Sequence, residues 1–342
     1  MRIGLTYNDV LLEPKFSDIR SRDEVRIGNI IANRHLSLPI ISAPMDTVTE
    51  DKMAIAMYRN GGLGILHRYN TIERQTMLAK TVLKKRLVEQ SCLVGAAIGV
   101  SGDYLERTEE LVRLGVPIIC LDIAHAHHTL TKNALYKLRS EFSSTHFMVG
   151  NVATPKAFKE LGEWGAHSIK VGIGGGSICS TRIKTGHGIP GLQSVMDCAR
   201  VKKTSGPLLI ADGGIKTSGD IVKALAVGAD FVMLGSLLAG TTESPGNILE
   251  SENGKVKIYQ GMASSEAQMK WKGKVSSREG ISTTIPFKGS VDIILEELGV
   301  GIRSGLSYSG ARDIIQFQKN ATLMRQTSAG VSEGRTHILE KK

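Results

Sequence analysis

The sequence predicts an α/β fold in which residues 1–342 form a single (β/α)8 barrel domain. First, the chain has 342 residues, of which 41% are hydrophobic and 22% charged, enough to bury a large core. Second, it contains eight short runs rich in Ile, Val and Leu, each ended by glycine or small polar residues. Third, seven of these runs are continuously apolar, as expected of strands that are covered on both faces.

The predicted strands alternate with helix-like stretches such as "DYLERTEELVRLG" and "TSGDIVKALAVGA". The strand starts are 22 to 39 residues apart, which is the spacing of successive βα units. Gly115, Gly165 and Gly228 each precede a strand, where glycine can adopt the left-handed conformation that ends a helix. A doubly wound open sheet and a two-domain chain are the alternatives. In order, the runs are "PIISAPMD" from Pro39, "GLGILHR" from Gly62, "CLVGAAIG" from Cys92, "PIICLDIA" from Pro117, "HFMVGNV" from His146, "SIKVGIGGG" from Ser168, "PLLIADGGI" from Pro207 and "FVMLGSLLAG" from Phe231.

Composition argues against several classes of protein. No apolar run approaches the roughly 20 residues of a membrane span, and the N-terminal segment lacks the apolar stretch of a signal peptide. The net charge of +10 is scattered in short groups, with few aromatic residues between them, so we expect no nucleic-acid partner. The four cysteines form no CxxC pair and are expected to be reduced. We therefore expect a cytoplasmic protein without a membrane partner.

In a barrel, the loops that follow the strands meet at one end, where ligands bind. Small and polar residues dominate the ends of the eight runs, as suits a polar ligand lying against backbone. The glycine loops "GIGGGS", "DGG" and "LGS" follow the last three runs, and glycine lets backbone N–H groups approach a phosphate. These ends contribute Ser42, Met45 and Asp46; His67 and Arg68; Asp122, His125 and His127; Asn151; Cys179; Asp212, Gly213 and Gly214; and Gly235 with Ser236.

Cys179 is the candidate nucleophile. It lies in the glycine loop with Thr181 two residues away and basic residues nearby, surroundings that favour a thiolate. Cys92, Cys120 and Cys198 are interpreted as core residues, two inside strands and one in a helix. His125 and His127 could suggest a metal, but no third ligand stands at a suitable spacing, and Asp122 is the better functional candidate.

Five motifs together resemble the family of IMP dehydrogenases and GMP reductases. They are "LTYNDVLLEP", "SAPMDTVTE", "VGIGGGSICSTR", "IADGGIKTSGDIVKALAVGADFVMLGSLLAG" and "YQGMASSEA", and the resemblance runs from about Leu5 to Tyr308. It implies a barrel that binds a purine nucleoside monophosphate through its phosphate loops, with a cysteine that attacks purine C2.

Within the family, three features resemble the reductases more than the dehydrogenases. "TVLKKRLVEQSCLVG" passes directly from helix to strand, leaving no room for the inserted regulatory CBS modules of most dehydrogenases. "TRIKTGHG" follows the cysteine as in reductases. The predicted mobile flap, about residues 261–289, lacks the adjacent Arg-Tyr pair whose arginine activates water in dehydrogenases. In contrast, "GTTESPG" and "LGSLLAG" look more dehydrogenase-like, and "SSREG" departs from the usual reductase flap.

The resemblance therefore implies GMP reductase activity, the NADPH-dependent reductive deamination of GMP to IMP and ammonia through a cysteine thioimidate. An IMP dehydrogenase without the insert and a non-catalytic nucleotide-binding barrel are the alternatives. The implied catalytic residues are Cys179, Thr181 and Glu279. The implied substrate contacts are Ser42, Met45, Ser177, Asp212, Gly213, Gly214, Gly235, Ser236, Gly261, Met262, Ala263, Arg278 and Gly280.

The same resemblance implies a cofactor site, a potassium site and a homotetramer. The cofactor contacts are Ser21, Arg22, Arg68, Asp122, Ile123, Ala124, Ile173, Gly174 and Met262. The potassium ligands are carbonyl groups of Gly174, Gly176 and Cys179, together with Arg182.

Overall fold

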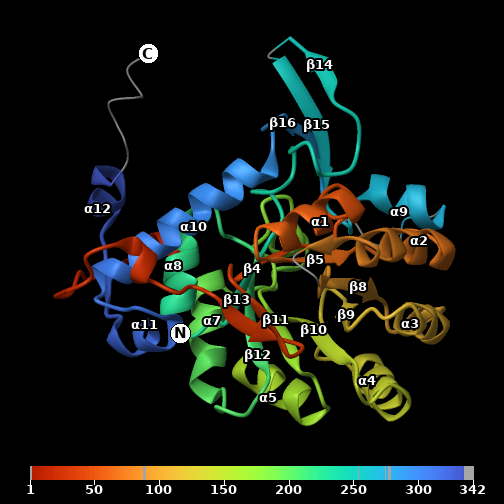
Figure 1. Cartoon of the computed structure of the whole chain (residues 1–342), viewed down its shortest axis with the longest axis horizontal. Coiled ribbons are helices and arrows are strands. Elements are labelled where there is room, and N and C mark those ends of the chain that lie inside the picture. Colours follow the sequence, from red (N-terminus) through yellow and green to blue (C-terminus); the bar gives the residue numbers. More distant parts are fainter. Residues whose placement is uncertain (1, 88–89, 253, 274, 276–278, 335–342) are drawn as a thin grey trace.

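The computed structural model of the chain describes residues 2–87, 90–252, 254–273, 275 and 279–334 (Figure 1). Its centre is a closed barrel of eight parallel strands, in the order β10-β11-β12-β13-β4-β5-β8-β9. Each strand falls within one of the eight apolar runs, so the predicted barrel is confirmed and the open sheet is wrong. The strands are β4 (Ile40–Ser42), β5 (Leu63–Leu66), β8 (Val94–Ile98), β9 (Ile118–Asp122), β10 (His146–Val152), β11 (Ser168–Val171), β12 (Leu208–Asp212) and β13 (Phe231–Leu234).

Helices surround the barrel (Figure 1). Several begin at a threonine whose hydroxyl accepts a backbone N–H, as Thr71, Thr154 and Thr217 do. Gly115, Gly165 and Gly228 have φ of +90°, +105° and +112°, so the predicted left-handed helix ends are confirmed. The surrounding helices are α1 (Asp51–Arg59), α2 (Ile72–Leu83), α3 (Tyr104–Arg113), α4 (Thr129–Glu141), α5 (Pro155–Glu163), α7 (Gly191–Val201), α8 (Ser218–Ala226) and α10 (Val291–Tyr308).

Two apolar clusters form the core. The larger one packs the helices against the outside of the strands. The smaller one fills the barrel and includes residues from β4, β5, β8, β9, β10, β12 and β13, such as Ile41, Met148 and Phe231. Among the described residues, β11 contributes no member to this inner cluster. The hairpin of β2 (Asn29–Ile31) and β3 (Arg34–Leu36) adds Ile31 and Leu36 to it, and these side chains cover the amino ends of the strands.

Shorter elements complete the chain. Between α2 and β8 lies a small hairpin of β6 (Arg86–Leu87) and β7 (Gln90–Ser91), so the predicted direct passage from helix to strand is wrong in detail. Cys92 lies between β7 and β8 rather than inside a strand, but it is buried as predicted. The N-terminal part holds η1 (Tyr7–Asp9), β1 (Val10–Leu12) and η2 (Arg22–Glu24), and the C-terminal part holds α11 (Ile314–Asn320), β17 (Leu323–Arg325) and α12 (Ser328–Glu333).

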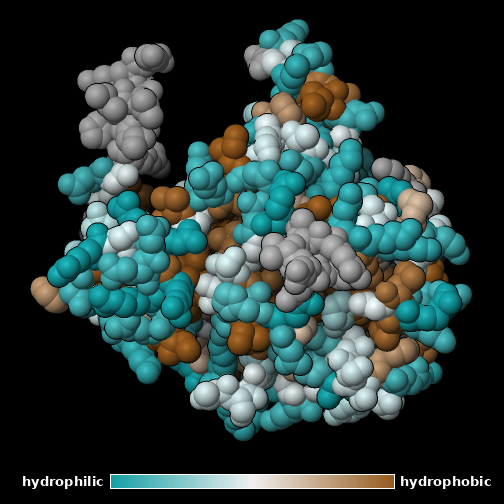
Figure 2. All heavy atoms as spheres, viewed as in Figure 1, coloured by the Kyte–Doolittle hydropathy of each residue, from teal (hydrophilic) through white to brown (hydrophobic). Residues whose placement is uncertain are grey.

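Three antiparallel strands project beyond the barrel: β14 (Leu249–Ser251), β15 (Gly254–Gln260) and β16 (Ser282–Pro286) (Figure 1). Figure 2 shows apolar side chains below the tip of this projection. Ile248 and Leu249, at the start of β14, are exposed. Helix α9 (Ser265–Lys272) follows β15 and, like β16, lies within the predicted flap. None of the helices in the described ranges is long and apolar enough to cross a membrane.

Candidate active site

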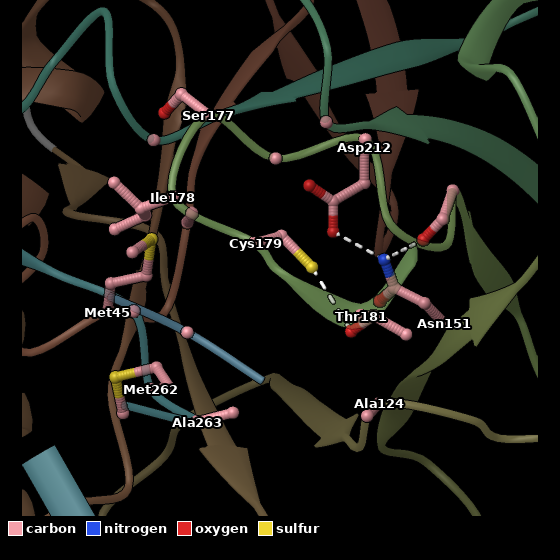
Figure 3. A pocket seen from close by; sticks show the side chains of 18 of the residues that line it. Met45, Ala124, Asn151, Ser177, Ile178, Cys179, Thr181, Asp212, Met262 and Ala263 are labelled. Carbon is pink, nitrogen blue, oxygen red and sulfur yellow. Dashed lines mark hydrogen bonds between the residues drawn. The ribbon is translucent and has the colours of Figure 1, made fainter. Parts of the chain in front are cut away.

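A cavity of about 400 Å³ opens at the carboxyl end of the barrel (Figure 3). Its walls are the loops that follow β4, β5, β9, β11, β12 and β13, joined by Asn151 of β10 and by residues of β15 and of the flap. This is the end at which barrels carry their chemistry. The cavity therefore lies where the sequence predicts a ligand site.

The loop after β11 carries the candidate nucleophile and ends at the short helix α6 (Thr181–Thr185). Gly172 begins this loop with φ of +150°, and a Cβ there would lie 1.8 Å from the carbonyl oxygen of Asp212. Only glycine lets the two loops approach so closely. Cys179 is partly exposed and lines the cavity, whereas the other three cysteines are buried, as predicted.

A chain of hydrogen bonds joins the nucleophile to an acid. The thiol of Cys179 donates to Oγ1 of Thr181 at 3.2 Å, and that hydroxyl donates to Oε2 of Glu279 at 2.8 Å. Glu279 lies 98 residues from Thr181 in the sequence. The structure thus brings together the three residues to which the resemblance gives catalytic roles.

Backbone pairing fixes Glu279 beside this loop. The N–H of Ser180 donates to the carbonyl of Glu279 at 2.9 Å, and the N–H of Ile281 donates to the carbonyl of Ile178 at 3.1 Å. Ile281 also accepts a bond from the N–H of Gly261 at 3.0 Å. The flap segment around Gly280 is therefore held like a short strand between the cysteine loop and the end of β15.

The glycine loops after β11 and β12 lie against each other. A Cβ on Gly213 would be 3.2 Å from the backbone nitrogen of Gly176, so these backbones are in near contact. Tyr259 of β15 lies beside them, with its hydroxyl 3.4 Å from Oγ of Ser177. Burial raises the pKa of Tyr259, which keeps the phenol protonated and able to donate. Backbone amides and hydroxyls of this kind can bind a phosphate.

The floor of the cavity carries two carboxylates. Nδ2 of Asn151 donates to Oδ2 of Asp212 at 2.9 Å and to the carbonyl of Gly172 at 2.8 Å (Figure 3). Burial raises the pKa of Asp212, and the buried ammonium of Lys170 acts in the opposite direction. Asp122, at the end of β9, forms an ion pair with the same lysine.

One wall of the cavity is cationic and aromatic. Arg68, in the loop after β5, donates from Nε to the carbonyl of Asp122 at 3.3 Å. Its guanidinium carbon lies 5.3 Å from the ring centroid of Tyr69, which stacks on Trp271 of α9 with centroids 6.2 Å apart. Ile123, Ala124 and other apolar groups continue this wall. A flat aromatic group and a nearby charge are features that suit a dinucleotide.

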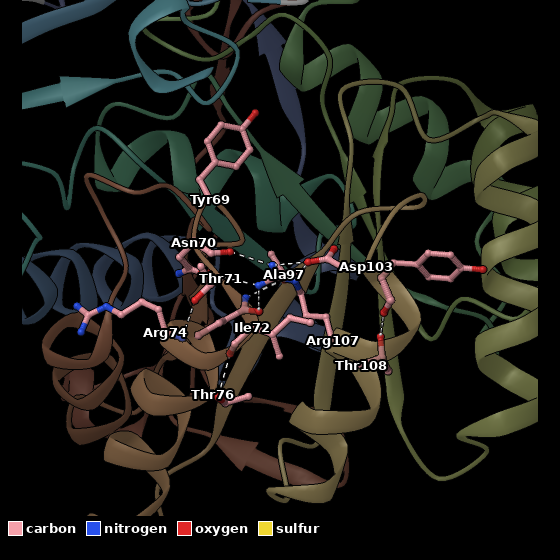
Figure 4. A network of polar contacts seen from close by, with 12 residues as sticks. Tyr69, Asn70, Thr71, Ile72, Arg74, Thr76, Ala97, Asp103, Arg107 and Thr108 are labelled. Atoms are coloured by element: carbon pink, nitrogen blue, oxygen red, sulfur yellow. Dashed lines mark hydrogen bonds and ion pairs between the residues drawn. The ribbon is translucent and has the colours of Figure 1, made fainter. Parts of the chain in front are cut away.

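A buried network holds the loop after β5 at Asn70 (Figure 4). Arg107 of α3 is 2% exposed and donates to Oδ1 and the carbonyl of Asn70, to Oε1 of Gln75 and to Oδ2 of Asp103. Four acceptors compensate for burial of this guanidinium. The loop after β5 is therefore anchored to α3 at Asn70.

Most of the predicted site residues line the cavity. Those that do are Cys179, Thr181, Glu279, Met45, Ser177, Asp212, Gly213, Gly214, Gly235, Ser236, Gly261, Met262, Ala263, Gly280, Arg68, Asp122, Ile123, Ala124, Ile173, Gly174 and Gly176.

Of the residues to which the resemblance gives a contact, five are not among the lining residues. Asp46, His67, His125 and His127, also predicted at this end of the barrel, do not line the cavity either. Ser42 is buried below the cavity, where its hydroxyl accepts from Thr49 at 2.9 Å. Ser21 precedes η2, and Arg22 lies in η2, away from the cavity lining of this chain. Arg182 lies behind the cysteine loop. Arg278 lies outside the described residues.

The predicted potassium loop has donors of a suitable type, since backbone carbonyls can bind potassium. Arg182 donates from Nη2 to the carbonyls of Ile173 and Ile189, at 3.4 and 2.5 Å. Neither carbonyl is a predicted potassium ligand. The carbonyl of Gly176 accepts from the N–H of Cys179 at 3.1 Å and keeps a second lone pair.

The histidine cluster has its own partners. Nε2 of His127 lies 2.8 Å from Oε2 of Glu160, and the ring stacks on Trp164. His125 packs edge-on against His127. The described residues include no group of three or more His, Cys, Asp or Glu side chains that could hold a metal ion.

Several residues of the site were not assigned from the sequence. Tyr259 immediately precedes the "QGM" motif, but its contact with Ser177 joins positions 82 residues apart. Asn151 was placed at a strand end without a role. Lys170 is a single charged residue inside an apolar run, and this isolated charge is the feature of the sequence that could have marked it as a site residue. Tyr69 and Gln268 also line the cavity.

Comparison with known proteins gives the family. A family model described as "IMP dehydrogenase / GMP reductase domain" matches residues 4–337. The chain belongs to this family. The relatives are therefore oxidoreductases named for two different reactions.

Relatives of both names are similar to the chain. GMP reductase from Leishmania major is 33% identical, with 99% of this chain and 97% of that protein covered. Inosine-5'-monophosphate dehydrogenase from Cryptosporidium parvum is 37% identical, with 98% and 96% covered. A cysteine-to-alanine variant of GMP reductase from Trypanosoma brucei, solved in complex with guanosine 5'-monophosphate, has a TM-score of 0.95 at 30% identity and covers 98% of both chains.

The length of the chain does not separate the two names. The alignment with the L. major reductase extends over 480 positions and that with the C. parvum dehydrogenase over 388, whereas this chain has 342 residues. Extra residues are therefore found in a reductase as well as in a dehydrogenase. The distinction must come from the chemistry of the site.

Proposed function

We propose that the protein is a GMP reductase that converts GMP to IMP and ammonia with NADPH. The observation that carries the proposal is the hydrogen-bonded chain from Cys179 through Thr181 to Glu279. It joins a nucleophile to an acid that can protonate a departing amine. The flap sequence supports the choice, because residues 261–289 contain no adjacent Arg-Tyr pair to activate water.

The first step uses one proton, which the thiol supplies and the chain of hydrogen bonds carries to the leaving amine. The thiol proton of Cys179 passes through the Thr181 hydroxyl to the carboxylate of Glu279, and the thiolate adds to C2 of guanine. The electron pair of the C2–N3 double bond moves to N3. When it returns, the bond to the amino group breaks, and Glu279 supplies the proton that leaves with ammonia. The product is a thioimidate on Cys179.

The second step restores the cysteine. NADPH, when bound, supplies the hydride for C2. The thiolate then leaves as the C2–N3 double bond re-forms, giving IMP, and a proton taken up from solvent restores the thiol. Arg68, Asp122, Ile123 and Ala124 would hold the cofactor along one wall of the cavity.

The remaining contacts would orient the nucleotide. Asp212 would accept the ribose hydroxyls, with its carboxylate fixed by Asn151 at 2.9 Å. The backbone of Gly214 and the hydroxyls of Ser177 and Ser236 would bind the phosphate. Met45, Gly261 and Met262 would lie beside the base, and they exclude water from the thioimidate.

The family resemblance extends the proposal to assembly and ion binding. We infer a homotetramer in the cytoplasm and a potassium ion on the carbonyls of Gly174, Gly176 and Cys179, near Arg182. Light scattering measures the first. Rates in potassium compared with sodium, at equal ionic strength, measure the second.

The C. parvum relative, at 37% identity, favours IMP dehydrogenase as the second candidate. The purified protein should be mixed with GMP and NADPH, and separately with IMP and NAD, while the absorbance of the reduced cofactor is followed. A fall only in the first mixture supports the reductase. A rise in the second, with steady XMP production, supports the dehydrogenase, and no change in either supports a binding protein without turnover.

A further inference from the structure

Lys170 occupies a position where the other barrel strands place apolar side chains. It lies in β11 and is 1% exposed, among the largest fully buried side chains of the described residues. Ser168 precedes it by two positions, so both point to the same face of the strand, and no described residue of β11 joins the inner apolar cluster. Burying an ammonium is costly unless it is paired, so this lysine needs a compensating role.

Its partners are the two carboxylates of the cavity floor. The ammonium forms an ion pair with Oδ1 of Asp122 from β9, and it lies 3.8 Å from Oδ2 of Asp212 from β12. The Asp122 and Asp212 side chains are 23% and 21% exposed and line the cavity, whereas the lysine side chain is 2% exposed. The lysine therefore lies beneath both carboxylates, and a ligand in the cavity would meet them rather than the lysine.

The two carboxylates face different parts of the proposed ligands. Asp212 is the proposed acceptor of the nucleotide ribose, and Asp122 adjoins Arg68 on the proposed cofactor wall. We propose that Lys170 is a positioning residue that couples the two ligand subsites by holding Asp122 and Asp212 against one ammonium. This inference rests on the proposed function, because it uses the subsites named there.

The groups around the lysine determine the effect of removing it. Asp122 and Cys120 face it from β9, Asp212 faces it from β12, and Arg68 adjoins Asp122 from the loop after β5. Burial raises the pKa of the Cys120 thiol to about 12, so this group is uncharged near neutral pH. Without the ammonium, the two carboxylates repel each other, and the pKa of Asp212 rises further.

The expected pH dependence follows from the ionised form of Asp212. A carboxylate accepts both ribose hydroxyls, so nucleotide affinity falls as pH drops through the pKa of this group. Raising that pKa moves the loss of affinity to higher pH. Lowering it, by removing the negative charge of Asp122, moves the loss to lower pH.

The test measures GMP and IMP affinity by calorimetry, without cofactor, across the acid range. Lys170→Met should weaken binding by about tenfold or more near neutral pH and move the loss to higher pH. Asp122→Asn should move the loss of nucleotide affinity to lower pH. The double variant should recover much of the affinity that Lys170→Met loses, because only one carboxylate remains.

The native protein and the three variants should also be compared for folding. Thermal unfolding separates lost stability from lost coupling. If the lysine were purely structural, replacing it would lower the unfolding temperature without changing the pH at which nucleotide affinity is lost. If Lys170→Met folds, a double variant that binds nucleotide no better than Lys170→Met overturns the proposal. If Lys170→Met fails to fold, the proposal is overturned when Asp122→Asn loses nucleotide affinity at the same pH as the native protein.

These outcomes are distinct from those of the reaction assay. A native protein that binds nucleotide but oxidises IMP overturns the reductase reaction and leaves the Lys170 test intact. A native protein that binds neither GMP nor IMP overturns both.

Discussion

The two ends of the barrel contain similar polar side chains in opposite settings. At the amino end, Nε2 of His146 lies 2.9 Å from Oγ of Ser168, and the β2–β3 hairpin covers the strands. At the carboxyl end, glycine loops leave a cavity of about 400 Å³ around Cys179. The two ends differ in whether the polar side chains are covered and not in how many there are. Covered polar side chains form a structural cluster, whereas those that face an open cavity can form a binding site.

The largest effect is expected at the nucleophile. Cys179→Ala should reduce turnover by at least about a thousandfold while leaving GMP binding measurable, because no other described cysteine faces the cavity. Steady-state rates and calorimetric binding measure the two quantities. Cys198→Ala is the matched control and should change the unfolding temperature but not the rate. Retained turnover in Cys179→Ala would remove this residue from the mechanism.

The next effect is expected at the acid on the flap. Glu279→Gln keeps the shape of the side chain but cannot carry the relayed proton, so ammonia release should slow by about a hundredfold. GMP affinity should change much less, since the proton is needed only in the transition state. Rapid-quench measurement of ammonia in a single turnover tests this. An unchanged burst of ammonia would exclude Glu279 as the acid.

At the closed amino end, the expected effect is on stability. Burial lowers the pKa of His146 from 6.5 to about 3, so the unfolded chain binds a proton that the folded chain does not. Stability from this group is present above pH 6.5 and is lost as pH falls toward 3. Between pH 6.5 and 5 the loss should be roughly 2 kcal/mol.

Urea unfolding at several pH values measures this loss. His146→Gln should show a shallower decline with acidity than the native protein, while kcat/KM near neutral pH stays close to native. A matching decline in both proteins would mean that other groups account for the acid sensitivity.

The smallest effect is expected at the edge of the cavity. Tyr259→Phe removes the hydroxyl 3.4 Å from Ser177 and should weaken nucleotide binding by about three- to tenfold, with kcat nearly unchanged. Initial rates at varied GMP concentration give KM and kcat separately. A fall in kcat alone would place Tyr259 in the chemical step instead of in nucleotide binding.

The sequence was sufficient for the barrel because each strand is covered on both faces. Continuous apolar runs marked β8 and β13, and the glycines at 115, 165 and 228 marked helix ends through a conformation that other residues rarely adopt. The hairpin of β6 and β7 was missed, since strands of two residues have no periodicity to detect.

The site was predictable where chemistry lies close in the sequence. Cys179 and Thr181 lie two residues apart, whereas the resemblance was needed to add Glu279, because no local pattern connects positions 98 residues apart. Ser42 was predicted to contact substrate, but its hydroxyl bonds to Thr49 below the cavity. The end of a strand can be predicted from sequence only to within one residue. Because neighbouring side chains of a strand point to opposite faces, that error is enough to reverse the predicted direction of a side chain.

The backbone pairing around Gly280 limits where the chain can tolerate changes in length. Ser180 and Ile281 form hydrogen bonds across this pairing, at 2.9 and 3.1 Å, and Glu279 reaches Thr181 only in the observed register. A shift of one residue would place a residue without a carboxyl group opposite Thr181. Insertions between Glu279 and Ile281 should therefore inactivate the protein even if it folds. The three residues that pair with the cysteine loop, Glu279 to Ile281, must therefore keep their spacing.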